Sequence, residues 1–231
     1  MNPELGHTSM AAYSNSSGFT GQSGKWTLMH VLLAHDASVL DVAVSTDHGI
    51  VAGASADGTV VIWTLRSGQY LRSLMPCVDP TIGDAIPQIS DRARGMRVER
   101  VLITAAAHIL CYSVRGSGDK LDPDRAVFGS EEGGEAALHV YNVNGRHMRT
   151  RKLAHRLHDI AVTRDGMFGA VVSSDARVAV FDVHTLGIVR QFELPACGCS
   201  VAWSGATEQQ IIVGCEGGTI VVISADLSYI H

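Results

Sequence analysis

The sequence predicts an all-β protein built from repeated four-stranded units, and three observations support this prediction. Short apolar runs rich in Val and Ile recur about every ten residues from Trp26 onward, separated by turns that contain Gly, Asp or Asn. No window of 12 residues shows the apolar stripe of an amphipathic helix. A long pattern also occurs twice, with corresponding residues 118 positions apart. Such repetition indicates an architecture before any chemistry is considered.

The two copies of this pattern both begin with Leu-Ala-His. The first is LAHDASVLDVAVSTDHGIVAGASADGTVVIW, residues 33–63, and the second is LAHRLHDIAVTRDGMFGAVVSSDARVAVFD, residues 153–182. A more divergent copy, residues 199–223, follows the second at an offset of 41 to 42 residues. One four-stranded blade of a β-propeller has about 40 to 45 residues, so this offset is the length of one blade.

The offset of 118 residues therefore contains two units plus inserted residues. We place the hidden unit at residues 98–114 and 137–154, with an Asn-Gly turn at 144–145. The insertions, 75–95 and 115–135, are rich in Pro, Gly and charge, so we expect flexible surface loops.

The resulting prediction is a partial β-propeller of about four blades, each a four-stranded antiparallel sheet, over residues 25–231. Residues 1–24, rich in Ser, Gly and Asn, are predicted to be a disordered leader. The expected strands lie near 27–33, 38–45, 50–55, 59–65, 69–74, 98–105, 108–114, 137–143, 147–153, 158–164, 168–173, 177–183, 187–193, 198–204, 210–215 and 218–224.

Composition limits the classes of function. A chain of 231 residues with 46% hydrophobic content can bury a sizeable core, and its net charge of −5 gives no general attraction to nucleic acid. The N-terminal residues lack the basic and apolar regions of a signal peptide, and no apolar run reaches the roughly 18 to 20 residues of a membrane span. The five cysteines, an odd number, fit reduced thiols. We therefore expect a cytoplasmic protein.

The motif of a His, then Ser-x-Asp-Gly-Thr and a Trp in the next strand, resembles the WD-repeat family. In that family a His, a Ser or Thr, an Asp and a Trp form a hydrogen-bonded network that holds one blade together. A buried His and Asp are tolerated when they are paired. In the second copy Phe181 replaces Trp and removes the indole donor, and the third copy has Gly217 near the Asp position. The resemblance implies a structural network formed by His35, Ser55, Asp57 and Trp63 in the first copy and by His155, Ser173 and Asp175 in the second.

A narrower resemblance covers residues 32–224. The series LLAHDxSVLDVAV, VIWTLRSGQYLRSL, YNVNGR, DxRVAVFD and EGGTIVVI is similar to the C-terminal WD-repeat region of BEACH-domain proteins, the neurobeachin-like group. This resemblance implies a protein-interaction scaffold in vesicle or membrane trafficking that acts from the cytosol and peripherally on membranes. The alternatives are a WD-repeat adaptor of an unrelated assembly, and a propeller that binds a small molecule or acts as an enzyme through polar residues of a central channel.

The sequence contains none of the common catalytic motifs. It has no Gly-x-Ser-x-Gly elbow, phosphate-binding loop or His-Glu-x-x-His, and its carboxylate pairs lie in the predicted loop 115–135. Cys197 and Cys199 are too close in sequence for ordinary zinc spacing and are expected to be buried thiols of a loop. We therefore predict no enzyme activity, no cofactor and no metal.

Two cationic runs remain open to two interpretations. Each is either a solvated surface, which for a strand prevents edge pairing, or a contact for an acidic partner or lipid headgroups. The candidate partner-binding residues of the first run are Arg146, Arg149, Arg151 and Lys152, and the second run, assigned to the first long loop, comprises Arg92, Arg94, Arg97 and Arg100.

The predicted number of blades also implies a partner that supplies further blades. A WD-repeat ring usually closes with seven blades, which requires about 280 to 300 residues at this repeat length. Open strand edges promote aggregation, so we expect further blades from a parent protein or from another chain to complete the ring. A closed four-bladed ring is the alternative and would need steeper packing of the blades.

Overall fold

The computed structural model describes residues 27–76, 96–115, 135–204 and 210–224. The predicted leader and almost all of both predicted loops lie outside the described residues. The chain divides into two compact units, Met1–Leu33 and Ala34–His231. In the first unit, residues 27–33 form no strand, so the strand predicted there is wrong. Its apolar side chains, among them Met29 and Leu33, are exposed, and a strand needs a hydrogen-bonded neighbour as well as apolar residues.

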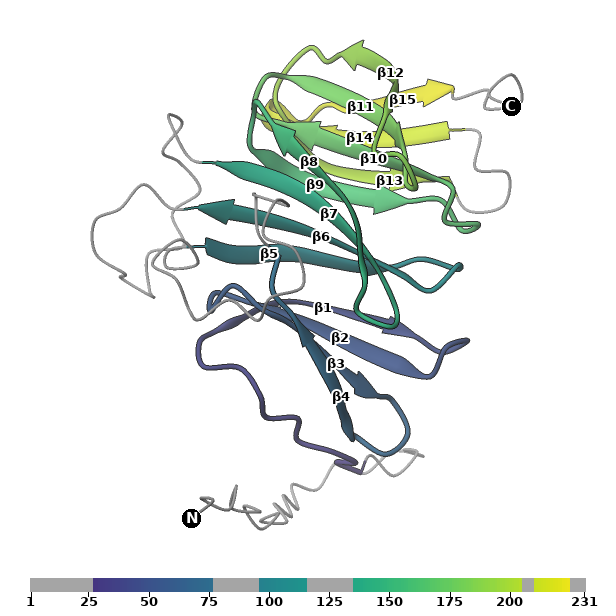
Figure 1. Ribbon diagram of the computed structural model, residues 1–231. Coiled ribbons are helices and arrows are strands. Elements are labelled where there is room, and N and C mark those ends of the chain that lie inside the picture. Colours follow the sequence, from purple (N-terminus) through teal and green to yellow (C-terminus); the bar gives the residue numbers. More distant parts are fainter. Residues whose placement is uncertain (1–26, 77–95, 116–134, 205–209, 225–231) are drawn as a thin grey trace, which may run out of the picture. The chain divides into compact units, whose positions relative to one another are not determined.

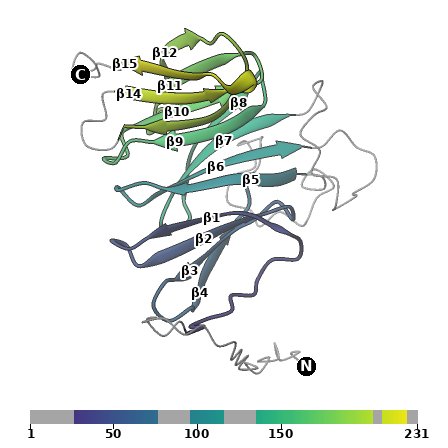
Figure 2. The same ribbon diagram turned by 180° about the vertical axis from the view of Figure 1, so that it is seen from behind.

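The second unit contains four antiparallel sheets that follow one another in chain order (Figures 1 and 2). We call them blades 1 to 4. All the remaining predicted strands are found, but blade 4 has three strands in the described residues and not the four expected. The strands are β1 Val39–Ser45, β2 Ile50–Ser55, β3 Val60–Thr64 and β4 Tyr70–Leu74 in blade 1; β5 Met96–Ile103, β6 His108–Arg115, β7 Ala136–Asn142 and β8 His147–Leu153 in blade 2; β9 Leu157–Val162, β10 Phe168–Ser173, β11 Arg177–Asp182 and β12 Ile188–Glu193 in blade 3; and β13 Gly198–Trp203, β14 Gln210–Cys215 and β15 Ile220–Ser224 in blade 4.

Local sequence explains the hairpins between the strands. The Asp-Gly turn between β2 and β3 places Gly58 at φ +85°, a conformation that other residues rarely adopt. A Cβ atom at Gly58 would also lie 2.9 Å from the carbonyl oxygen of Met96. The helical content of the described residues is a single 3-10 turn, Glu216–Gly218, between β14 and β15.

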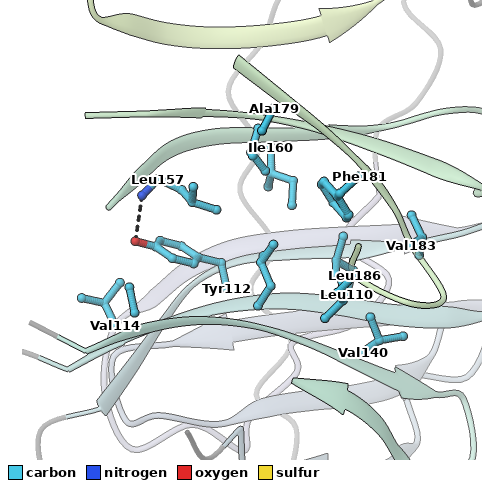
Figure 3. Packing of buried hydrophobic residues seen from close by; sticks show 13 residues of the cluster. Leu110, Tyr112, Val114, Val140, Leu157, Ile160, Ala179, Phe181, Val183 and Leu186 are labelled. Atoms are coloured by element: carbon cyan, nitrogen blue, oxygen red, sulfur yellow. Dashed lines mark hydrogen bonds between the residues drawn. The ribbon is translucent and has the colours of Figure 1, made fainter. Parts of the chain in front are cut away.

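Neighbouring blades pack face to face through three apolar clusters. One joins blades 1 and 2 and includes Ile62 and Val101. The second joins blades 2 and 3 and is drawn in Figure 3, where Tyr112 lies beside Leu157. The third joins blades 3 and 4 and includes Val201. Blades 2 and 3 each contribute to two of these clusters, because successive side chains of a strand point to opposite faces of the sheet.

The first strand of every blade is irregular at the same place. The pairing of β1, β5, β9 and β13 with the next strand shifts by one residue at Leu40, Glu99, His158 and Cys199, respectively. Such β-bulges redirect the side chains next to them. Asp41, Arg100, Asp159 and Ser200 therefore occupy equivalent positions, each directly after its bulge.

Candidate functional site

The network of blade 1 is centred on Asp57, in the turn between β2 and β3. Its carboxylate accepts hydrogen bonds from the main-chain N–H of Thr59 at 2.8 Å, from the Thr59 hydroxyl at 2.6 Å and from the N–H of Asp36 at 2.9 Å. His35 Nδ1 lies 3.1 Å from Asp57 Oδ2. Burial opposes ionisation, but the hydrogen bonds from Thr59 and Asp36 and the charge interaction with His35 outweigh it and lower the pKa of Asp57.

The other two expected members of this network have different contacts. The Trp63 ring meets His35 edge to face, with ring centroids 5.7 Å apart, above Gly53, where a Cβ atom would lie 3.2 Å from the indole. Ser55 is buried, donates to the carbonyl oxygen of Ala37 and accepts the N–H of Asp57, so it holds the turn and not the histidine. The structure thus brings His35, Asp57 and Trp63 together.

Blade 3 assembles the same residue types more loosely. Ser173 donates to Asp175 Oδ1, but His155 Nε2 lies 3.8 Å from Asp175 Oδ2, and the His155 side chain is 53% exposed against 5% for His35. Arg177 stands where blade 1 has Thr59 and approaches Asp175 at 3.7 Å. Phe181 covers Gly169, the residue directly opposite it on β10, and supplies no hydrogen-bond donor.

Blade 2 contains a network that the sequence did not reveal. His139 on β7 is fully buried, with Nε2 2.7 Å from Ser113 Oγ and Nδ1 2.9 Å from Thr150 Oγ1. His147 Nε2 reaches the same threonine hydroxyl at 2.7 Å. Each hydroxyl can donate or accept, so both nitrogens of a neutral His139 are satisfied in either tautomer. Burial, reinforced by His147, lowers the pKa of His139 to about 3.

A repeated bond links one blade to the next. Asp41 Oδ2 of β1 accepts the N–H of Val101 on β5 at 2.9 Å, and Asp159 Oδ2 of β9 accepts the N–H of Val201 on β13 at 3.0 Å. The two aspartates are 118 residues apart, and this shared offset was the available sequence signal for their common role.

The candidate partner-binding cations lie on β8 and on the turn before it. Arg146, Arg149 and Lys152 are exposed, whereas Arg151 is half-buried and donates to the carbonyl oxygen of Leu186 in blade 3 at 2.9 Å. Arg151 therefore joins two blades, and its three neighbours remain open to solvent. Of the second cationic run, Arg97 belongs to β5 and not to a loop, as does Arg100.

Cys197 and Cys199, the cysteines considered as metal ligands, have different surroundings. Cys199 is exposed on β13 and not buried in a loop as expected, and Cys197 contacts His158 Nδ1 at 3.5 Å. Across the described ranges, no group of three or more His, Cys, Asp or Glu side chains could hold a metal ion.

Comparison with known proteins agrees with these geometries. Residues 26–64, which contain the whole blade 1 network, match the family model WD domain, G-beta repeat. The chain thus contains a segment that is similar to a WD repeat. It is 24% identical over 198 residues to BEACH domain-containing protein B of Arabidopsis thaliana. That match covers 85% of this chain but 6% of the Arabidopsis protein.

Solved structures show the same fold. The computationally designed protein Ika4 matches with a TM-score of 0.58 and 15% identity, over 87% of this chain and 99% of Ika4. The β-propeller domain of Myceliophteria thermophila Cps50 (Swd1) matches with a TM-score of 0.56 and 11% identity, over 84% of this chain and 53% of that domain. At these identities the likeness shows the fold alone, a partial β-propeller.

In the part of the chain that the structure describes, no helix is long and apolar enough to span a membrane.

Proposed function

We propose that this chain is a non-catalytic scaffold for protein–protein interactions that acts in vesicle or membrane trafficking, in the cytoplasm and peripherally on membranes. The match to a BEACH-domain protein over 85% of the chain supports the choice of process. The observation that carries the scaffold role is the exposed apolar face of β1, where an additional propeller blade would pack.

Equivalent residues of the four blades define this face. Val42 follows the bulge of β1 as Val101, Ile160 and Val201 follow those of β5, β9 and β13. The last three are 2%, 6% and 7% exposed because the preceding blade covers each of them, whereas Val42 is 57% exposed. An additional blade before blade 1 would bury Val42 in the same way.

The hydrogen bonds of β1 support the same conclusion. The N–H groups of Val101 and Val201 donate to an aspartate of the preceding blade, but the N–H of Val42 donates to Asp41 Oδ1 of its own strand at 2.9 Å. At the other end of the series, Ile220 and Val222 of β15 are also exposed. We assign both faces to further blades, supplied by a parent protein or by another chain.

In this proposal two hydrogen-bonded networks each stabilise a single blade. One surrounds His35 and Asp57, and the other surrounds His155 and Asp175. Arg146, Arg149 and Lys152 are left as contacts for an acidic partner, because their side chains are exposed and Arg151 is held between blades. No role in catalysis is assigned to any of these residues.

A photo-crosslinking experiment tests the proposal. The residue p-benzoylphenylalanine replaces Val42 in the chain expressed in its own cells, and crosslinked peptides are identified by mass spectrometry. Position 190, exposed on the outer strand β12, serves as the control site. We expect crosslinks from position 42, and not from 190, to WD-repeat segments of a protein with a BEACH domain.

Two outcomes would contradict different parts of the proposal. Equal crosslinking from both positions would show that the β1 face has no dedicated partner. Crosslinks from position 42 to WD-repeat segments without any trafficking component would favour the alternative, an adaptor of an unrelated assembly.

A further inference from the structure

The junction between blades 2 and 3 departs from the repeated inter-blade bond. At the position where blades 1 and 3 have Asp41 and Asp159, blade 2 has Arg100. A guanidinium has no acceptor atom, so Arg100 cannot take the N–H of Ile160 as the two aspartates take those of Val101 and Val201. A position that breaks a local rule of the fold is a candidate for function.

Arg100 belongs to a cluster of three arginines at this junction. Arg97 Nη2 and Arg156 Nη2 lie 2.6 Å and 2.5 Å from the same atom, Oε1 of Glu99. Arg100 Nε lies 3.9 Å from Asp159 Oδ1. Arg97 and Arg100 come from β5, and Arg156 directly precedes β9, so both blades contribute.

The cluster is positive and open to solvent. Its three guanidinium groups face two carboxylates, which leaves an excess of one positive charge in a chain whose net charge is −5. The arginine side chains are 35%, 37% and 32% exposed at positions 97, 100 and 156, whereas Glu99 between two of them is 18% exposed. The carboxylates thus hold the guanidinium groups in place and leave their outer edges available.

We propose that this junction binds an acidic peptide segment of a partner protein, with Arg100 as the residue that makes the site. Guanidinium groups match the geometry of carboxylate and phosphate and form charge-assisted hydrogen bonds with them. The cations are held at two separate points, Glu99 and Asp159, which suits an extended ligand with several negative groups better than a single small anion. An anionic membrane would meet a whole face of this chain of net charge −5, whereas a peptide segment meets only the local positive cluster, so we favour the peptide. This inference goes beyond the proposed scaffold role, because the site does not depend on an additional blade at β1.

Binding of a labelled peptide tests this assignment. The probe is a fluorescein-labelled peptide with four consecutive glutamates, and the same peptide with glutamines is the reference. Fluorescence anisotropy in low salt should show binding of the glutamate peptide alone, and the affinity should fall as salt is added. Equal binding of both peptides would overturn the proposal.

Arg100→Asp separates ligand binding from stability. This change restores the repeated aspartate, which can accept the N–H of Ile160, so the urea midpoint of unfolding should not fall. Affinity for the glutamate peptide should fall at least about tenfold, because charge-assisted contacts are lost and a carboxylate is added. The matched control, Arg190→Asp, changes the charge equally on the exposed outer strand β12 and should alter affinity less than twofold. Unchanged affinity in Arg100→Asp would overturn the proposal, as would an equal loss in the control.

Glu99→Gln should change the affinity for the glutamate peptide in the opposite direction. Removing the carboxylate that neutralises Arg97 and Arg156 should tighten peptide binding by about threefold, an outcome that loss of folded structure cannot produce. Weaker binding by a folded Glu99→Gln variant would contradict the proposal. Inorganic phosphate at millimolar concentration should compete poorly, and complete displacement would identify a small-anion site. Binding to phosphatidylserine vesicles, but not to the peptide, would identify a lipid site.

Discussion

Blades 1 and 2 are adjacent and have the same strand order, but each is stabilised by a different kind of polar network. The network of blade 1 surrounds an ionised carboxylate at a turn, with Asp57 bound by Thr59 and His35. The network of blade 2 is neutral and lies inside the sheet, where His139 connects two hydroxyl groups. An equivalent serine is present in both, since Ser55 and Ser113 each pair with the residue directly before the bulge of the first strand.

The insertions explain the difference. In blade 1 the aspartate comes from the turn between the second and third strands, and the histidine comes from the segment before the first strand. In blade 2 residues 116–134 separate β6 from β7, and residues 77–95 precede β5, so the repeat pattern is interrupted at both places. A strand residue, His139, replaces these two contributors. Blades 1 and 2 therefore both have a satisfied polar link between their strands, but the chemistry of that link differs.

The largest expected effect comes from breaking the blade 2 network. His139→Leu should lower the free energy of unfolding by about 3 kcal/mol, because the fully buried Ser113 hydroxyl loses its partner and Thr150 keeps only His147. Urea denaturation measures the change. The matched control, His155→Leu, replaces a half-exposed histidine and should cost less than about 0.5 kcal/mol. Equal losses of stability in the two variants would show that the buried network contributes no more than the exposed histidine.

A pH titration separates the two networks. The pKa of His139 is about 3 in the folded chain and about 6.5 when unfolded, so the unfolded state binds a proton first as the pH falls. Stability contributed by neutral His139 is therefore complete above pH 6.5 and declines below it. From pH 7 to pH 5 the wild type should lose about 2 kcal/mol more than His139→Gln, in which this group does not titrate. Parallel stability curves of the two proteins would contradict the neutral network.

Blade 1 should respond to pH in a lower range. The folded pKa of Asp57 is lowered, so its contribution is present above the unfolded value of about 3.9 and is lost as the pH falls below it. Asp57→Ala should cost about 2 kcal/mol at pH 7, because hydrogen bonds to a charged acceptor are lost. The difference from wild type should persist at pH 5 and shrink below pH 4. A difference that already disappears at pH 5 would contradict an ionised Asp57 as the centre of the network.

The sequence predicted the strands and the chemistry of blade 1 because both have local signatures. Apolar runs between Gly- and Asp-containing turns identified every strand from β1 to β15, and the Asp-Gly motif placed Asp57 in a turn. The strand expected at 27–33 failed because apolar residues alone do not provide a neighbouring strand.

The blade 2 network could not be predicted in this way. His139 and Ser113 are 26 residues apart on either side of an insertion, and no short motif connects them. The role of Arg151 was hidden for a different reason. Arg149 and Arg151 lie two residues apart on β8, so the alternation of a strand assigns them to the same face. The acceptor of Arg151, the carbonyl oxygen of Leu186, lies 35 residues away in blade 3 and leaves no local signal in the sequence.

The smallest expected effect comes from Thr59 of blade 1. This residue belongs to the sequence motif, but the motif did not reveal its role. Thr59→Val keeps the shape of the side chain and the main-chain bond to Asp57 but removes the hydroxyl that donates to Oδ1 at 2.6 Å, so it should cost about 1 kcal/mol. In a double-mutant cycle, Thr59→Val should cost less when Asp57 is already Ala, because the hydroxyl then keeps only its contact with His35 Nδ1 at 3.1 Å. A coupling energy near zero would mean that Thr59 stabilises the strand and not the carboxylate. Blade 3, with Arg177 in the position of Thr59, already lacks this bond, and its more exposed histidine fits a network that depends on the threonine.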